Sequence, residues 1–96
     1  MAKQQKIKWI IGMSGSEWDA VDVYSFEGTK HEAKKILARL VKEDAKEDDF
    51  DYGDTKISDV KENGNVLYAG STFNDHHNDY TATPLSEVPN IESFFN

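Results

Sequence analysis

Apolar residues between positions 33 and 41 recur with the spacing i, i+3, i+4, i+7 and i+8, which predicts a helix with one buried face. The members of this stripe are Ala33, Ile36, Leu37, Leu40 and Val41. Just ahead of it, Thr29 and Glu32 have the spacing of a capping box, in which each side chain accepts a hydrogen bond from the backbone N–H of the other residue. Asp44 would fall at the centre of the stripe if the helix continued. We therefore predict that the packed helix spans about residues 30–43.

Short stretches rich in β-branched and aromatic residues predict strands on both sides of this helix. These stretches are 7–13, 18–27, 55–61, 65–73 and 80–85. The Gly-Ser turn between the first two favours an antiparallel hairpin, and Asn63-Gly64 favours a second hairpin with a type I′ turn. Pro84 lacks a backbone N–H, which suits an edge position for the last strand. Residues 74–79 are expected to form a polar loop.

The element order ββ-α-ββ(β) predicts an α+β fold, a two-layer sandwich in which an antiparallel sheet of four to five strands carries one helix on one face. Residues 1–96 are expected to form a single domain. Three segments stand outside its predicted core. Residues 1–6 lack an apolar anchor and are expected to fray, residues 43–54 form an acidic linker, and residues 91–96 form an apolar tail whose order the sequence leaves open.

The composition restricts the chemistry that this domain could perform. Hydrophobic residues make up 38% and aromatic residues 11% of the chain, which favours a folded protein over disorder. The absence of cysteine excludes disulfides, thiol nucleophiles and thiolate metal sites. No apolar run approaches the ~20 residues of a membrane helix, and no secretory signal is recognised. We therefore expect a cytoplasmic protein that binds no membrane and no cofactor.

Charge is distributed unevenly along the chain, which has a net charge of −7. Residues 1–42 carry eight basic and five acidic side chains, whereas residues 43–96 carry three basic and thirteen acidic ones. Carboxylates arrayed at a density comparable to nucleic-acid phosphates can occupy the basic channel of another protein. The candidate partner-binding residues are Glu47, Asp48, Asp49, Asp51 and Asp54. The alternative is that this acidic segment only keeps a small domain in solution.

One dense group of metal-capable side chains is Asp75-His76-His77-Asn78-Asp79. Imidazole and carboxylate ligands suit zinc, nickel, copper or iron. Adjacent histidines on a strand would point to opposite faces, so both could reach one ion only from a loop. The candidate ligands are Asp75, His76, His77 and Asp79, and the alternative is an ordinary polar hairpin tip.

Two other motifs do not carry their usual chemistry. A calcium loop that starts at Asp49 places Gly53 at position 5 and Val60 at position 12, where a bidentate glutamate is required. The run Gly12-Met13-Ser14-Gly15-Ser16 is close to a nucleophile elbow, but it ends in serine and lies between two predicted strands. Nothing in the sequence places a histidine beside a serine, so we predict no Ser/His/Asp triad.

The strand start at Trp18-Asp19, the long charged helix, the acidic segment and the ending Asp79-Tyr80-Thr81-Ala82-Thr83-Pro84 resemble small uncharacterised proteins of Gram-positive phages and conjugative elements. This resemblance covers most of the chain and includes no catalytic motif. It implies an accessory protein of a mobile element and does not imply an activity.

The sequence thus favours a non-catalytic, acidic binding or regulatory module that docks on another macromolecule, with an unknown protein as the partner. A nucleic-acid-mimicking inhibitor is one form of this hypothesis. We expect no direct binding to nucleic acid, because the acidic chain as a whole would repel it. The alternative hypothesis is a metal-dependent or acid–base enzyme centred on residues 75–79.

Overall fold

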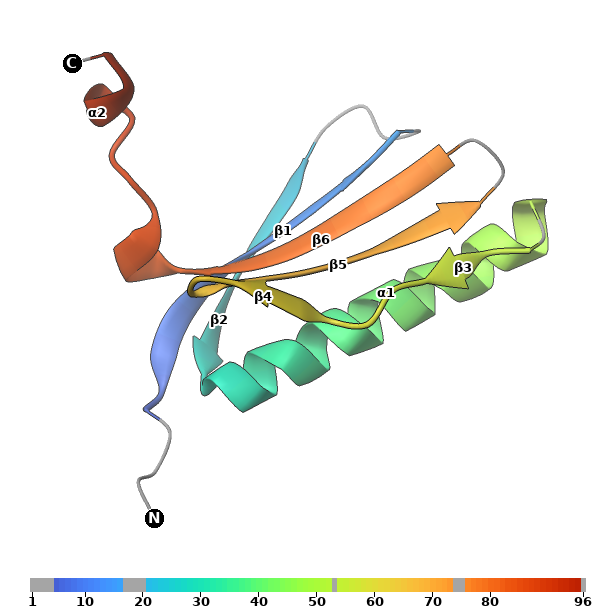
Figure 1. Ribbon diagram of the computed structural model, residues 1–96, viewed down its shortest axis with the longest axis horizontal. Coiled ribbons are helices and arrows are strands. Elements are labelled where there is room, and N and C mark those ends of the chain that lie inside the picture. Colours follow the sequence, from blue (N-terminus) through green and yellow to red (C-terminus); the bar gives the residue numbers. More distant parts are fainter. Residues whose placement is uncertain (1–4, 17–20, 53, 74–75, 96) are drawn as a thin grey trace.

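The protein consists of two layers, a single antiparallel sheet and one long helix that lies along one of its faces (Figure 1). The computed structural model describes residues 5–16, 21–52, 54–73 and 76–95, and describes side chains in these ranges except at 48–52. The molecule is only 19 Å deep along its shortest axis, which matches one sheet and one helix. The predicted α+β class is therefore confirmed, with the observed element order ββ-α-ββββ.

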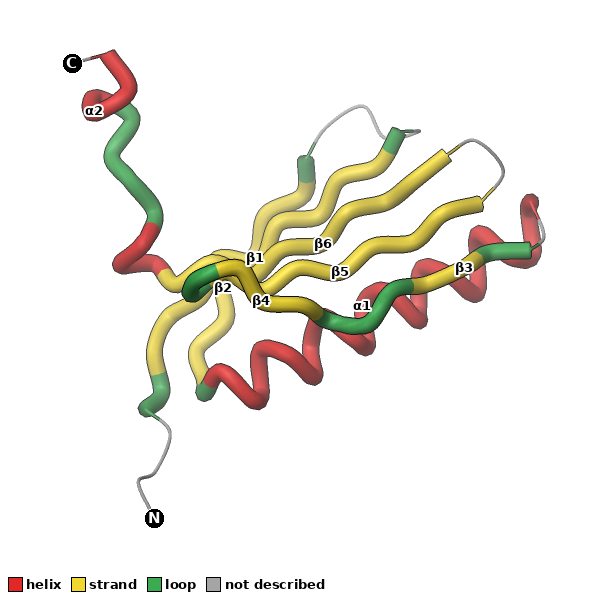
Figure 2. Tube along the Cα trace, viewed as in Figure 1, coloured by secondary structure: helices red, strands yellow, loops and turns green. Residues whose placement is uncertain are grey.

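Six strands form the sheet, in the order β2-β1-β6-β5-β3, with β4 also paired to β5 (Figure 2). The strands are β1 (Ile7–Gly15), β2 (Asp22–Gly28), β3 (Lys56–Ile57), β4 (Lys61–Asn63), β5 (Val66–Phe73) and β6 (His76–Pro84). The single strand predicted over 55–61 is therefore divided into β3 and β4. The register with β5 shifts by one residue between Lys56↔Thr72 and Lys61↔Tyr68, and Val60, which packs against the core, lies in the stretch where it shifts.

The last strand begins four residues earlier than the predicted start at residue 80, so the polar loop predicted over 74–79 is wrong for residues 76–79. The edge position predicted from Pro84 is also wrong, because β6 lies between β1 and β5 and Pro84 is the last residue of the strand. Asn78 and Tyr80 are both buried on the helix side of β6, and their spacing of two continues the strand pattern back into the polar sequence. The start of the second strand at residue 18 and the resemblance at Trp18-Asp19 lie outside the described residues. Its described part begins at Asp22.

The core fills the space between the sheet and the helix α1 (Lys30–Tyr52). It is built from Trp9, Ile11, Met13, Ala33, Leu37, Val41, Leu67, Tyr80 and Ala82. The Trp9 indole N–H donates to the Gly28 carbonyl oxygen at 3.1 Å, so the largest core side chain has its polar atom paired. In the described parts of the chain, no helix is long and apolar enough to cross a membrane.

The predicted capping box is present at the start of α1. The Glu32 backbone N–H donates to Thr29 Oγ1 at 3.1 Å, and the Thr29 backbone N–H donates to Glu32 Oε1 at 3.0 Å. Hydrogen bonds from the Thr29 backbone and side chain lower the pKa of the Glu32 carboxyl. The first turn of α1 is thus closed by contacts that the local sequence alone specifies.

The predicted helix end near residue 43 is wrong, and most of the predicted acidic linker 43–54 is helical, because α1 continues to Tyr52. Asp44 does face the core side of α1, as the stripe predicts. The buried Tyr80 hydroxyl donates to Asp44 Oδ2 at 2.6 Å. The Asp44 carboxylate is therefore tolerated at the centre of the stripe, because the Tyr80 hydroxyl on β6 donates a hydrogen bond to it.

Replacement of Thr29 by alanine is expected to reduce the free energy of unfolding by about 1 kcal/mol, because the orphan N–H of Glu32 loses its acceptor. Urea unfolding followed by circular dichroism measures this loss. Thr29→Ser is the matched control, since it keeps the hydroxyl and should stay within a few tenths of a kcal/mol of the wild type. An equal loss in both variants would show that the hydroxyl is not what stabilises the helix start.

Candidate functional site

The predicted partner-binding acids lie at the carboxyl end of α1. Glu47, Asp48, Asp49 and Asp51 are on its last turns, and Asp54 follows the helix. Glu47 and Asp54 are exposed, while the side chains of the other three lie outside the described residues. The carboxyl end of a helix carries a partial negative charge, and the last turn of α1 has no basic residue to offset it. These acids therefore do not stabilise α1, and their role in partner binding remains a prediction.

The two histidines of the predicted metal site lie on opposite faces of β6. His76 is on the helix side, with its ring 5.6 Å from the Phe73 ring, whereas His77 is exposed on the open face of the sheet. His77 Nε2 lies 3.4 Å from Asp79 Oδ2. Asp75 lies outside the described residues. Over the ranges that the structure describes, no three side chains of the metal-ligating types are gathered at one point.

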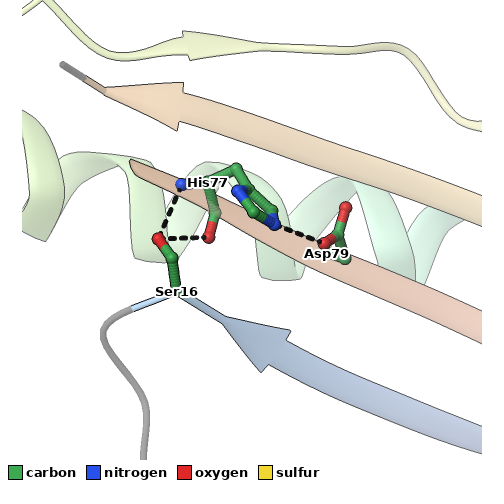
Figure 3. A network of polar contacts seen from close by, with 3 residues as sticks. All are labelled: Ser16, His77 and Asp79. Atoms are coloured by element: carbon green, nitrogen blue, oxygen red, sulfur yellow. Dashed lines mark hydrogen bonds and ion pairs between the residues drawn. The ribbon is translucent and has the colours of Figure 1, made fainter. Parts of the chain in front are cut away.

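Ser16, His77 and Asp79 lie close together at the end of β1 and β6, but they do not form a nucleophilic triad (Figure 3). Ser16 Oγ accepts a hydrogen bond from the His77 backbone N–H at 3.0 Å and donates to the His77 carbonyl oxygen at 3.3 Å. The imidazole instead points toward Asp79. In a triad, a ring nitrogen of the histidine accepts the proton of the serine hydroxyl, whereas here the Ser16 hydroxyl contacts the His77 backbone instead. The contact therefore extends the pairing of β1 with β6 and does not activate the serine.

A hollow of about 370 Å³ lies where the start of β1 meets the segment after β6. It is lined by Gln5, Ile7, Trp9, Lys30, Asn65, Pro84, Ser86 and Glu87. Lys30 Nζ is 2.6 Å from Glu62 Oε2, and hydrogen bonds from Lys30 and Lys34 lower the pKa of Glu62 to about 2. Asn65 Nδ2 donates to Glu87 Oε1 at 2.8 Å. The charged groups of the lining are thus engaged with neighbouring side chains rather than poised for proton transfer.

The two edges of the sheet differ in how they are protected. On one side, β3 and β4 are two and three residues long, exposed, and contain Lys56 and Lys61. Short charged edge strands discourage pairing with another chain. On the other side, β2 runs for seven residues without lysine or proline, and within the described residues only β1 pairs with it. The β2 edge is therefore open to a further strand.

An apolar groove lies beside the β2 edge, between β2 and α1. It has a volume of about 250 Å³ and is lined by Ile11, Tyr24, Ser25, Phe26, Ile36 and Leu40. The groove exists because α1 packs mainly on β5 and β6 and covers β2 less. Tyr24 is 56% exposed as a result. We call this surface the β2–α1 groove.

Three large apolar side chains, Ile91, Phe94 and Phe95, project from the segment after β6, and we call them the hook. They lie on and just before the single-turn helix α2 (Glu92–Phe95), which stands away from the sheet (Figure 1). Their exposed fractions are 69%, 80% and 76%, the highest among the large hydrophobic residues that the structure describes. The sequence left the order of this tail open; the structure describes it through Phe95.

The apolar stripe does not predict the β2–α1 groove, because Ile36 and Leu40 have the same spacing as the residues that form the core. Both are only half-buried, whereas Leu37 between them is fully buried. A usable signal was the strand 21–26, which carries apolar residues on both faces. Such a strand has more apolar surface than one covering helix can bury.

No protein-family model, no curated protein and no solved structure matches this chain. The function therefore has to be argued from the surfaces of the molecule itself.

Proposed function

We propose that this protein is a non-catalytic binding module that docks on another protein by inserting the hook into an apolar groove of that partner. The exposure of the hook carries this proposal. Ile91, Phe94 and Phe95 gather three large apolar side chains within five residues, each more than two-thirds exposed. Contiguous exposed apolar surface marks interaction sites, and aromatic residues supply most of the binding energy at such sites.

The turn that holds the hook is ordered by Asn90. Its side-chain Oδ1 accepts a hydrogen bond from the Glu92 backbone N–H at 2.8 Å, and its carbonyl oxygen accepts one from Ser93 Oγ at 2.7 Å. A single turn is too short to be a stable helix by propensity alone, so these caps are what favour it. A preordered turn costs less entropy on binding, which supports a docking role for the hook.

The spacing of the hook residues indicates how the partner would receive them. Ile91, Phe94 and Phe95 stand at i, i+3 and i+4, the spacing of anchors on a helix that lies in a groove. The Phe94 and Phe95 rings meet edge to face, with centroids 5.3 Å apart, so they present one continuous apolar surface. The fitting partner is a protein with a hydrophobic groove of about one helical turn.

The acidic half of the chain favours a basic surface around that groove. Residues 43–96 carry thirteen acidic and three basic side chains; Glu87 precedes the hook and Glu92 lies between its residues. Complementary charge mainly accelerates encounter, and salt screens it beyond about 8 Å at physiological ionic strength. The predicted partner-binding acids, from Glu47 to Asp54, would act in this steering role. Mimicry of nucleic acid by these acids stays a prediction.

The double variant Phe94→Ala/Phe95→Ala is expected to bind its partner at least about tenfold more weakly than the wild type, because two aromatic anchors are lost. Affinity capture from the native host with both proteins as bait identifies the partner, and titration calorimetry with the purified partner measures the dissociation constants. Val88→Ala removes exposed apolar surface from the same segment outside the hook and is the matched control. Equal dissociation constants for the double variant and the wild type would refute the proposal.

A further inference from the structure

The β2 edge offers backbone hydrogen-bonding groups that a further strand could use. Along an antiparallel ladder, successive residues point their N–H and C=O groups alternately to one neighbour and to the other. Ser16 donates its N–H to His77 on β6, so by alternation the residues Met13, Ile11 and Trp9 turn theirs toward β2. Their cross-strand partners on β2 are Asp22, Tyr24 and Phe26, whose backbone N–H and C=O groups therefore point toward β1. Val23 and Ser25 are thereby left with backbone groups that face away from the sheet.

The side chains beside this edge determine what an added strand would carry. Tyr24, Phe26, Ile36 and Leu40 line the β2–α1 groove directly below it. A strand laid along β2 directs alternate side chains to the helix side, where the apolar groove would receive them. Val21 and Val23, each 61% exposed, lie on the opposite face, where the methylene stems of long side chains on the added strand would cover them.

Charge distinguishes between a second copy of this chain and a different protein as the source of the strand. The charged residues of β2 are Asp22 and Glu27, both exposed, and Glu43 follows Leu40 at i+3 on the groove side of α1. A second copy would bring the same acids and a further net charge of −7. Asp22 and Glu27 lie near the two ends of β2, Asp22 on the groove side and Glu27 on the open face. The alternate side chains of an added strand that point to the open face would meet Glu27 there, which favours basic residues at those positions.

We propose that β2 is a receptor edge that accepts an extended segment of a partner protein in which apolar side chains, directed into the β2–α1 groove, alternate with basic ones. This surface is separate from the hook and does not depend on it. The protein would therefore bind partners at two surfaces. At the hook it would insert a helical turn into a partner, and at the β2 edge it would bind a strand of a partner.

A fluorescein-labelled peptide of eight residues in which valine and lysine alternate is the probe, and fluorescence anisotropy with the full-length protein measures its binding. We expect saturable binding that weakens as salt rises, and no binding of the matched valine–glutamate peptide. In an amide NMR spectrum, the largest shifts are expected at Val23 and Ser25. Absence of saturable binding, equal binding of both peptides, or self-association of the protein through β2 overturns the proposal.

Two variants distinguish backbone pairing of the peptide with β2 from non-specific electrostatic attraction of a basic peptide to an acidic protein. Ser25→Pro removes the outward N–H at the centre of β2 and should weaken binding of the valine–lysine peptide at least about tenfold. Tyr24→Thr keeps a residue with high strand propensity but removes a side chain that lines the groove, so it should also weaken binding of the peptide. This variant provides the test if Ser25→Pro does not fold. Lys56→Thr on the opposite edge is the control and should leave binding unchanged or slightly tighter. Undiminished binding in a folded Ser25→Pro or Tyr24→Thr variant contradicts the proposal.

Discussion

Replacement of Leu37 by alanine is expected to reduce the free energy of unfolding by about 2–5 kcal/mol. Leu37 is 0% exposed and packs at the centre of the helix stripe, so its removal leaves a cavity between α1 and the sheet. The loss combines the transfer free energy of the deleted groups with the contacts forfeited around the cavity. Urea unfolding of the wild type and the variant measures this loss, provided that the free energy of unfolding depends on urea concentration with the same slope in both.

Leu40→Ala provides a matched control on the same helix. Leu40 is only half-buried at the β2–α1 groove, so the same deletion there should cost clearly less than at Leu37. The two substitutions change the same atoms and the same helix propensity, so the difference between them reports burial alone. An equal loss at the two positions, or a larger one at Leu40, would contradict the packing described for α1.

Tyr80→Phe is expected to reduce the free energy of unfolding by about 1–3 kcal/mol, because the Asp44 carboxylate loses a donor on the core side of α1. The hydroxyl is the only group removed, so packing of the ring is preserved. Tyr68→Phe on the open face of the sheet is the control, and it should change stability by less than about 0.5 kcal/mol.

A double-mutant cycle with Asp44→Ala tests whether the two residues act as a pair. If the hydrogen bond is what holds the acidic half of α1 on the sheet, the loss from Tyr80→Phe should largely vanish once Asp44 is alanine. Additive losses would show that each residue contributes through other contacts. The extension of α1 beyond residue 43 would then need another explanation.

The parts of the fold that follow local rules could be predicted from the sequence. The capping box at Thr29 and Glu32 and the stripe from Ala33 to Val41 involve residues at most eight positions apart, and the structure confirms both. The end of α1 could not be predicted, because the partner of Asp44 is Tyr80, 36 residues away. The early start of β6 likewise depends on a distant partner, because the buried Asn78 stands opposite Gly15 of β1.

The candidate surfaces depend still more on topology than on local pattern. β2 is an edge because β6 pairs with the other side of β1, and no local pattern reveals which strands become neighbours. For the same reason, the sequence alone does not exclude a shared metal ion, because a loop over residues 74–79 would let His76 and His77 reach the same ion. Once His76 and His77 are strand residues, the period of two sends their side chains to opposite faces. The hook is the opposite case, since its apolar residues stand out in the sequence itself.

The central claim is that this protein acts by surface contact through the hook, and an amide NMR titration of the labelled full chain with its captured partner tests it most directly. The account predicts that the largest shifts fall on Ile91, Phe94 and Phe95, because these side chains become buried in the partner. Shifts concentrated at His77 and Asp79 on the open face of the sheet, with the hook resonances unchanged, would contradict it.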